Sequence, residues 1–483
     1  MTTTLQKQYE TVIGLEVHLQ LKTQTKIFCG CPNIFGREPN SQTCPICLGL
    51  PGTLPVLNKK VLEYAIKIAL ALNCRVNKFV KFDRKNYYYP DLPKGYQISQ
   101  YDLPIASGGF ILVTNAKNEV KKIHIKRAHL EEDAGKLIHD PQDNCSLVDY
   151  NRTGTPLMEI VTEPDLRSPQ EAYDYLQTLK LILQYLDVSD CDMEKGSLRC
   201  DANISLRFKD EEKFGTKAEV KNMNSFRAVK LALEFEEDRQ KKLLEAGERI
   251  IQETRLWHEE KGMTITMRSK EEAHDYRYFP EPDLVPFVLE QETIGQIQKS
   301  LPELPEKKLK RFLEIYKLSD YDAHILVEER SRADFFEACA KLYPETKKIC
   351  NWINGPLLQE LNSRKASLES LSLEPQYLTT LIKKVEDGTL SNLAGKEVLR
   401  EVIESGQSVE EVIEKKGLAQ VSDDGALNRI IEEVIGEHDN IVSQIKSGKE
   451  TAIGFLVGQA MRKTQGKGNP KKIGELLRRR ISQ

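Results

Sequence analysis

Residues 11–21 alternate strictly between apolar and polar side chains. This period of two predicts a β-strand with one buried face. Its polar face carries Glu16 and His18 two residues apart, so both side chains lie on one side of the pleat, within reach of a shared metal ion or phosphate group. A charged face that only meets water is the alternative interpretation. The apolar positions are Leu15, Val17, Leu19 and Leu21, and the polar ones are Glu16, His18 and Gln20.

The same alternation returns at residues 197–207 and 217–221, again with charged side chains on the polar face. Further acidic residues lie between these segments, and one of them, Glu159, stands in an apolar run where an unpaired carboxylate would be costly. Carboxylates on a sheet, interleaved with His, Lys and Arg, suit magnesium ions that hold the phosphates of a nucleotide. We favour this hypothesis over scattered surface charge. The acidic residues concerned are Glu131, Glu132, Glu159, Asp201 and Glu219.

Helical periodicity begins at three places in the first part of the chain, and Asn or Ser provides the expected N-cap at each. From about residue 297 one amphipathic helix follows another. We therefore predict an α+β fold in three domains, with a sheet domain at 1–295, a helical domain at 296–405 and a small helical tail at 406–483. The first three helices are predicted at 58–72, 168–186 and 225–246.

The composition, 40% hydrophobic and 30% charged, is ordinary for a globular protein, and the net charge of −3 excludes a uniformly basic nucleic-acid binder. No apolar run reaches the length of a membrane span and no signal-peptide core is present, so we expect a cytoplasmic protein without a membrane partner. Residues 451–483 nevertheless contain eight Lys and Arg against one Glu. This basic pole favours contact with an RNA backbone over a merely solvated tail. The predicted RNA-binding residues are Arg462, Lys463, Lys467, Lys471 and Lys472.

Four of the ten cysteines form a C-x-C pair and a C-x-x-C pair separated by twelve residues. Two turns of this kind can present four thiolates to a zinc ion. Because disulfides are rare in cytoplasmic proteins, we favour zinc over four incidental thiols. Four thiolate ligands leave no open position, so the ion would be structural. The predicted ligands are Cys29, Cys31, Cys44 and Cys47.

Two further segments, 82–91 and 274–283, are rich in aromatic and charged residues and contain proline. This composition is typical of ordered loops near a cleft. Their basic residues Arg84, Lys85 and Arg277 could each bind a phosphate group. A loop that simply packs on the sheet is the alternative.

Several long motifs occur in order along the chain, at residues 12–18, 81–87, 96–100, 129–136, 196–203 and 275–283. Together with the Gly-Phe-Leu-Val-Gly-Gln segment near the end, they resemble the B subunit of the tRNA-dependent amidotransferase. The resemblance implies a glutamine-synthetase-like antiparallel sheet that forms a cradle, followed by a helical domain and a helical tail. It also implies an amidase (A) subunit and a small C subunit as partners, tRNA(Gln) or tRNA(Asn) as bound RNA, and ATP, magnesium and, through the cysteines, zinc as cofactors.

The implied activity is that of an ATP-dependent carbon–nitrogen ligase within a heterotrimer. The side-chain carboxylate of Glu-tRNA(Gln) or Asp-tRNA(Asn) would be phosphorylated and then amidated with ammonia that the partner releases from glutamine. The resemblance implies His18, Glu132 and Glu159 as ligands of one magnesium ion, and Glu16, Glu131, Asp201 and Glu219 as residues of the same cavity that could hold a second. Two alternatives stay open, a non-catalytic tRNA-binding scaffold and a zinc hydrolase, although four thiolates argue against the latter.

Overall fold

The computed structural model describes residues 8–115, 117, 119–140, 144–269, 276–418, 424–447, 450–464 and 470–482. The chain divides into two compact units, Met1–Leu304 and Pro305–Gln483. The first unit combines a large sheet with helices, and the described residues of the second contain helices but no strand. The mixed α+β class is therefore confirmed. The boundaries predicted at 295 and 405 remain predictions.

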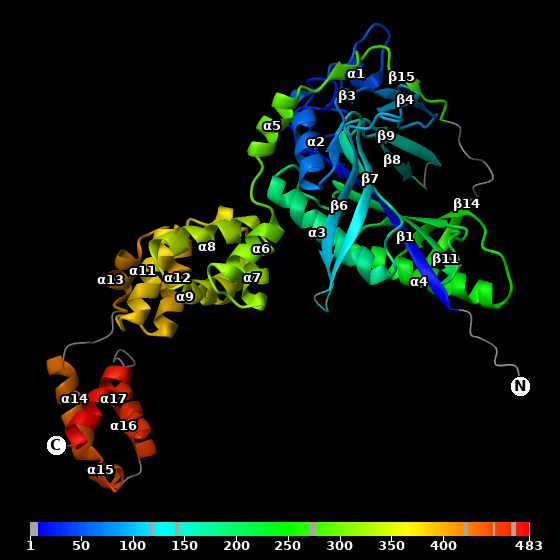
Figure 1. Ribbon diagram of the computed structural model, residues 1–483. Helices are drawn as coiled ribbons and strands as arrows, with labels where there is room; N and C mark the ends of the chain where they lie inside the picture. The colour runs from blue at the N-terminus through cyan, green and yellow to red at the C-terminus, as the bar shows by residue number, and fades with distance from the viewer. Residues whose placement is uncertain are drawn as a thin grey trace, which may run out of the picture. The chain divides into compact units, whose positions relative to one another are not determined.

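A nine-stranded sheet dominates the first unit (Figure 1). In spatial order its strands are β14 (Met263–Ser269), β13 (Glu253–His258), β12 (Ala218–Met223), β11 (Leu198–Phe208), β1 (Tyr9–Gln20), β10 (Pro156–Thr162), β7 (Val120–Glu132), β6 (Ala106–Thr114) and β2 (Arg75–Val76). All neighbouring pairs are antiparallel except β12 and β13, which are parallel. The expectation of a wholly antiparallel sheet is wrong at this pair, because helix α4 (Phe226–Glu245) joins the two strands and provides the crossover that a parallel pair requires.

Helices α2 (Lys59–Ala71), α3 (Pro169–Leu186) and α4 pack against one face of this sheet (Figure 1). Leu15, Val17 and Leu19 of β1 point into the resulting core and are at most 1% exposed. The side chains of Asn58, Ser168 and Ser225 accept backbone N–H groups in the first turns of the three helices. The predicted helices are thus confirmed, because apolar periodicity and the caps indicate the same limits. The opposite face of the sheet remains available for polar side chains.

The two segments predicted as loops form part of a second, three-stranded sheet of β15 (Phe279–Pro280), β4 (Asp83–Asn86) and β5 (Tyr96–Ser99). Phe279 pairs with Arg84, so the segments lie side by side although almost 200 residues separate them. The loop prediction missed this pairing because strands of two to four residues are too short to show an alternating pattern. Strand β5 contacts β7, where the backbone N–H of Ile98 donates to Glu132 Oε1 at 2.9 Å. On the opposite side of β7, the hydroxyl of Ser99 in β5 donates to Glu131 Oε2 at 3.3 Å, so the small sheet also reaches the polar face of the large one.

The remaining strands form two small pairs, and the remaining helices are short. The strands are β3 (Phe79–Val80) with β16 (Phe287–Val288), and β8 (Lys136–Asp140) with β9 (Cys145–Asp149). The helices are α1 (Pro45–Leu48), α5 (Gln291–Lys299), α6 (Pro305–Glu314), α7 (Asp320–Val327), α8 (Arg330–Leu342), α9 (Thr346–Trp352), α10 (Leu358–Arg364), α11 (Pro375–Glu386), α12 (Asn392–Ser405), α13 (Val409–Lys416), α14 (Asp424–Glu437), α15 (Asp439–Lys446), α16 (Ile453–Lys463) and α17 (Pro470–Ile481).

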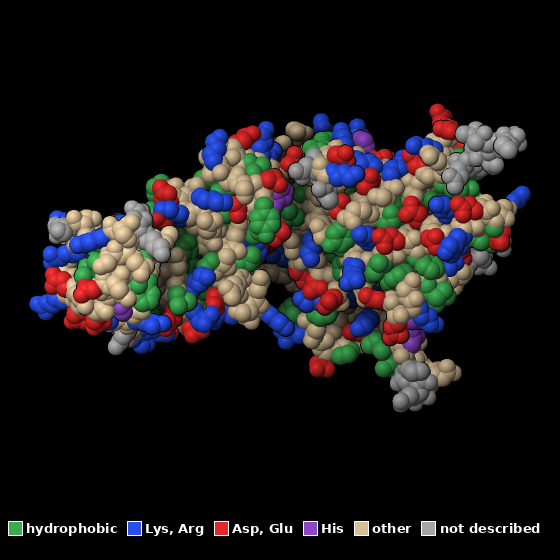
Figure 2. All heavy atoms as spheres, turned by 90° about the horizontal axis from the view of Figure 1, so that it is seen from below, with side chains coloured by type: hydrophobic (Ala, Val, Ile, Leu, Met, Phe, Trp, Pro, Cys, Tyr) green, Lys and Arg blue, Asp and Glu red, His purple; other side chains and the backbone are tan. Residues whose placement is uncertain are grey.

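Helices α14, α16 and α17 share a hydrophobic cluster of their own, centred on Leu427, Ile431, Leu456 and Leu477. On the face of the molecule shown in Figure 2, acidic and basic side chains are interspersed, in keeping with the small net charge. Among the described helices, none combines the length and the apolar character that crossing a bilayer requires.

The packing of α3 on the sheet predicts how substitutions on its two faces change the free energy of unfolding. Leu179 is completely buried, so Leu179→Ala should lower the free energy of unfolding by about 2–5 kcal/mol through lost burial and a residual cavity. Gln177 on the same helix is exposed, and Gln177→Ala should change this free energy by less than about 0.5 kcal/mol. Urea unfolding followed by circular dichroism measures both. Equal effects of the two substitutions would contradict the assignment of the buried face.

Candidate functional site

Strand register brings four polar side chains into one row on the open face of the large sheet. Across four neighbouring strands, Arg199 of β11 faces His18 of β1, His18 faces Glu159 of β10, and Glu159 faces His129 of β7. Directly opposed residues in antiparallel strands share a face and lie about 5 Å apart, so the row is a continuous line of functional groups. The sequence motifs that supply it are separated by up to 181 residues and meet only in the folded sheet.

His18, Glu131 and Glu159 lie together on this face, and we call these three residues the acidic group. The Nε2 atom of His18 lies 3.2 Å from Glu159 Oε2 and 3.6 Å from Glu131 Oε1. One ligand atom from each of the three residues lies within 4.8 Å of the others, close enough to share one ion. The two carboxylates provide the hard oxygen ligands that magnesium prefers, and the imidazole of His18 adds one nitrogen ligand. The residues present therefore fit a magnesium ion.

The structure places Glu131, and not Glu132, with His18 and Glu159. Successive residues of a strand point to opposite faces, so Glu131 and Glu132 cannot both face the same group. Glu132 instead points to the other side of β7, where it forms a buried ion pair with Lys94. The predicted set of His18, Glu132 and Glu159 thus differs from this group at one residue, and the identity of the magnesium ligands stays a prediction. The pair Glu131 and Glu132 could not be resolved in the sequence without the register of β7.

Basic side chains stabilise the two buried carboxylates. His129 is 3% exposed, and its Nε2 atom lies 3.3 Å from Glu159 Oε2 and 3.6 Å from Glu131 Oε2. Burial alone would lower the pKa of His129, but Glu159 and Glu131 outweigh burial and raise this pKa to about 9. Burial would raise the pKa of Glu159, yet His129 and His18 hold this pKa well below its usual range. Both carboxylates therefore stay ionised and available to a cation.

The cationic residues predicted to bind phosphate have different surroundings. The guanidinium of Arg84 is held by Glu281 through contacts of 2.7 and 2.8 Å and also contacts Asp283 at 3.2 Å, so it already has carboxylate partners. Lys85, the next residue of β4, lies 4.8 Å from the ring centre of Tyr276. Burial lowers the pKa of Lys85, but Glu131 and other nearby groups outweigh burial and raise it, so Lys85 faces the acidic group as a cation. Arg277 lies at the surface.

Glu16, Asp201 and Glu219 lie further along the same face. Glu16 stands opposite Asp201 in the register and accepts a hydrogen bond of 3.1 Å from Asn203 Nδ2. Lys221 forms ion pairs with both Asp201 and Glu219. Among the residues that the structure describes, these three carboxylates do not form a compact group that could share one ion. The second magnesium site therefore stays a prediction.

A cavity of about 330 Å³ opens on this face beside Glu16. Its lining includes Lys126, Arg127 and Lys217, and Arg127 Nη2 lies 3.9 Å from Glu159 Oε1. The buried Nε atoms of Arg127 and of Arg199 have no hydrogen-bond partner among the described residues. Unsatisfied cationic donors next to a polar cavity suit an anionic ligand. The residues of this face that were not predicted from the sequence are Arg127, His129 and Lys221. His129 was signalled by its position two residues before Glu131 on the same strand face.

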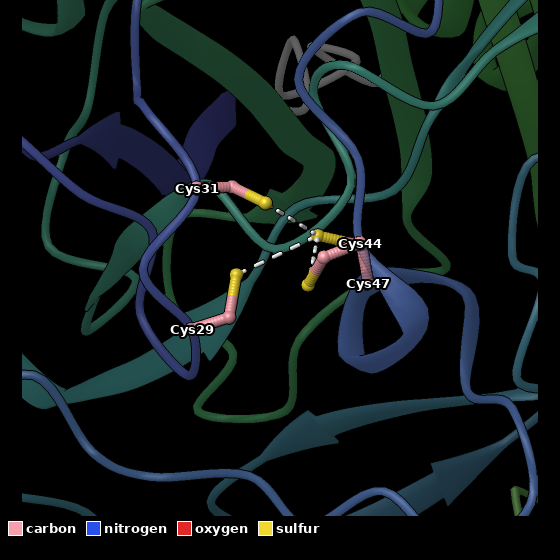
Figure 3. A group of neighbouring side chains, drawn as sticks. All are labelled: Cys29, Cys31, Cys44 and Cys47. Atoms are coloured by element: carbon pink, nitrogen blue, oxygen red, sulfur yellow. Dashed lines mark hydrogen bonds between the residues drawn. The ribbon is translucent and has the colours of Figure 1, made fainter.

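The four predicted cysteine ligands form a compact group (Figure 3). The Sγ atom of Cys47 lies 3.5 Å from that of Cys29, 3.7 Å from that of Cys44 and 3.8 Å from that of Cys31. Hydrogen bonding from Cys29 and the nearby ammonium of Lys26 lower the pKa of the Cys47 thiol to about 4 despite burial. The thiolate is the form that binds metal. The geometry and the donor chemistry fit a tetrahedral zinc site.

The predicted RNA-binding residues of the tail are only partly described. Lys463 of α16 forms ion pairs with Glu433 and Glu437 of α14, at 3.1 and 2.6 Å, so its charge is partly neutralised within the tail. Arg462 is exposed. Lys467 lies outside the described residues, as does the side chain of Lys471, whereas Lys472 is half-buried in α17. RNA contact by this surface remains a prediction.

Comparison with known proteins places this chain in one family. Residues 11–295 match the family model described as the GatB/GatE catalytic domain, and residues 334–481 match the GatB domain. The chain is 53% identical over 481 residues to the B subunit of the aspartyl/glutamyl-tRNA(Asn/Gln) amidotransferase of Carboxydothermus hydrogenoformans, with 99% of each chain covered. It is 52% identical over 476 residues to the protein of that name from Moorella thermoacetica, covering 98% of this chain and 100% of the relative. The chain belongs to the family of amidotransferase B subunits.

The environment of His129 predicts a pH dependence. Because its folded pKa of about 9 exceeds its ordinary value of 6.5, the protonated ring stabilises the folded chain fully below about pH 6.5, and this contribution is lost as the pH rises through 9. In magnesium-free buffer the free energy of unfolding should fall by on the order of 2 kcal/mol across this interval. His129→Gln should flatten the profile, whereas His124→Gln, at a half-exposed ring, should not. Chemical denaturation at a series of pH values tests this, and an unchanged slope in His129→Gln would contradict it.

Proposed function

We propose that this chain is the ATP-using subunit of a tRNA-dependent amidotransferase. It phosphorylates the side-chain carboxylate of Glu-tRNA(Gln) or Asp-tRNA(Asn), and ammonia then converts the acyl phosphate to the amide of Gln-tRNA(Gln) or Asn-tRNA(Asn). The observation that carries the proposal is the group of His18, Glu131 and Glu159, set in a sheet face lined with cationic side chains. The names of the full-length relatives support the same reaction.

The reaction meets an electrostatic obstacle that these residues can remove. A carboxylate does not react with ammonia directly because oxide would be its leaving group. The γ-phosphoryl group of ATP must first be transferred to a carboxylate oxygen, with ADP as the leaving group, and ammonia then displaces phosphate. His18, Glu131 and Glu159 would hold magnesium, which neutralises charge on the transferred phosphoryl group. The ammonium of Lys85 faces the same acidic group and would orient the carboxylate of the aminoacyl side chain toward the phosphate. The open face of the large sheet would thereby act as the cradle for both substrates.

The cavity beside Glu16 is the best place for the nucleotide. Lys126, Arg127 and Lys217 line it, and the unpartnered Nε of Arg127 can donate to a phosphate oxygen. Glu16, which lines the cavity, would hold a second magnesium ion together with Asp201 and Glu219 of the neighbouring strands, once the phosphates bring their own oxygen ligands.

The proposal divides the work among subunits. An amidase (A) subunit would release ammonia from glutamine and deliver it shielded from water, since protonation would give unreactive ammonium. A small C subunit would complete a cytoplasmic heterotrimer. The basic tail, through Arg462, Lys467, Lys471 and Lys472, would contact the tRNA backbone. The cysteine group would hold a structural zinc ion.

Substitution of the acidic group tests the kinase step. Glu159→Gln and His18→Ala should each lower the rate of ADP formation with Glu-tRNA(Gln) by at least about 100-fold, because the cation loses a ligand. Binding of tRNA by the complex should be unchanged, and Glu248→Gln at an exposed loop serves as the control. A non-catalytic scaffold would retain ADP formation in both variants, and that result would overturn the proposal.

The cysteine group predicts about one zinc ion per chain in the purified protein. Cys31→Ser should lower the zinc content to less than half and reduce the melting temperature, since a structural site contributes directly to folding. Cys145→Ser, at an exposed thiol on β9, should change neither. Elemental analysis and the thiolate-to-cobalt absorption of the cobalt-substituted protein give the readouts. A full zinc content in Cys31→Ser would contradict the assignment of the zinc site to the cysteine group.

A further inference from the structure

The end of β7 is fixed on the side that faces away from the acidic group. Glu132 forms a buried ion pair with Lys94, and the two side chains are 4% and 7% exposed. Its carboxylate also accepts the N–H of Ile98 at 2.9 Å, and its carbonyl oxygen accepts a hydrogen bond of 2.7 Å from Gln97 Nε2. Residue 132 is thus held by both side chain and backbone. Glu131, its immediate neighbour, carries the carboxylate that faces His18, so the placement of residue 132 determines the placement of Glu131.

Lys94 in turn lies directly on Gly49. This glycine follows helix α1 with φ 64° and ψ 36°, a left-handed conformation that favours glycine. A Cβ atom at position 49 would lie 2.3 Å from Lys94 Cγ and 3.2 Å from its Cβ and Cδ. The alkyl stem of Lys94 therefore fills the space that any larger residue at position 49 would need.

Gly49 is fixed by the cysteine group. Cys44 is the N-cap of α1 and Cys47 lies within this helix (Figure 3). Gly49, two residues after Cys47, is the C-cap of α1. Lys26, which is completely buried, places its Nζ atom 3.5 Å from Cys47 Sγ and 2.7 Å from the carbonyl oxygen of Gln42. A cavity of about 170 Å³ is lined both by the cysteine group and by the end of β7. Its lining includes Cys47, Gly49, Lys94 and Glu132.

We propose that Lys94 is a positioning residue, seated on Gly49, through which the cysteine group determines how Glu131 faces the cation site. Lys94 acts through Glu132, on the side of β7 that faces away from the acidic group. The cysteine group thereby has a second role beside local stability, because displacement of α1 moves Gly49, then Lys94, and then the end of β7. The inference rests on the proposed function of His18, Glu131 and Glu159 as a divalent-cation site.

Two glycines of the same loop provide a matched experiment. Gly49 and Gly52 both have positive φ, 64° and 86°, so alanine strains the backbone at each, but a Cβ at position 52 would meet nothing within 4 Å. The probe is Mn²⁺ alone, titrated by electron paramagnetic resonance into the full-length chain in its complex. Gly49→Ala should weaken Mn²⁺ binding about tenfold, the lower end of the range for groups that orient metal ligands, whereas Gly52→Ala should change it less than about twofold. Backbone strain should lower the melting temperature in both variants, and the clash with Lys94 should add to the loss in Gly49→Ala.

A double-mutant cycle assigns the effect to Lys94. Lys94→Ala removes the stem that a Cβ at position 49 would strike, so in this background Gly49→Ala should weaken Mn²⁺ binding no more than Gly52→Ala does. If Gly49→Ala does not fold, Lys94→Met keeps the stem on Gly49 and removes the charge, and it should weaken Mn²⁺ binding relative to Lys60→Met at an exposed site. Equal affinities in the two glycine variants, an undiminished effect in the Lys94→Ala background, or wild-type affinity in Lys94→Met would each overturn the inference. Wild-type protein that binds no Mn²⁺ would overturn the proposed cation site itself.

Discussion

The burial of two carboxylates at one point of a sheet is the constraint on which the site depends. Glu131 and Glu159 are 3% and 7% exposed, and like charges withdrawn from water are tolerated only with compensating positive charge. His18 and His129 provide it from the adjacent strands. A divalent cation can replace the positive charge of the protonated histidines. The two buried carboxylates, which destabilise the fold when unpaired, therefore favour the binding of such a cation.

This constraint explains the layers around the site. Helices α2, α3 and α4 cover the apolar face of β1 and bury it in the core. The polar side chains of the strand therefore all lie on its opposite face. The small sheet of β15, β4 and β5 carries Lys85, whose pKa Glu131 raises against the effect of burial. The cysteine group and α1 support the same region from the far side of β7. Catalytic and structural parts of the first unit therefore converge on the end of one strand.

Local sequence patterns predict many of the helices and strands. The positions of individual site residues depend on the pairing register of the strands, which the sequence does not show. Period-two alternation at residues 11–21 and the caps at Asn58, Ser168 and Ser225 predict elements that the structure confirms. The choice between Glu131 and Glu132 cannot be made this way, because adjacent acidic residues on a strand differ only in the face they present. Likewise, Arg84 resembles a phosphate ligand in the sequence, whereas its bidentate partner Glu281 lies 197 positions further along the chain.

Chain order has a consequence for synthesis. β1 is the first strand made, yet its two neighbours, β10 and β11, end only at residues 162 and 208. During translation at about 5–20 residues per second, this apolar, alternating strand has no partner for roughly ten seconds or more. Unpaired strands of that kind recruit other chains by edge pairing. The central strand of the finished sheet is therefore a segment of the nascent protein that needs protection, and the cation site cannot form before Glu159 of β10 has been made.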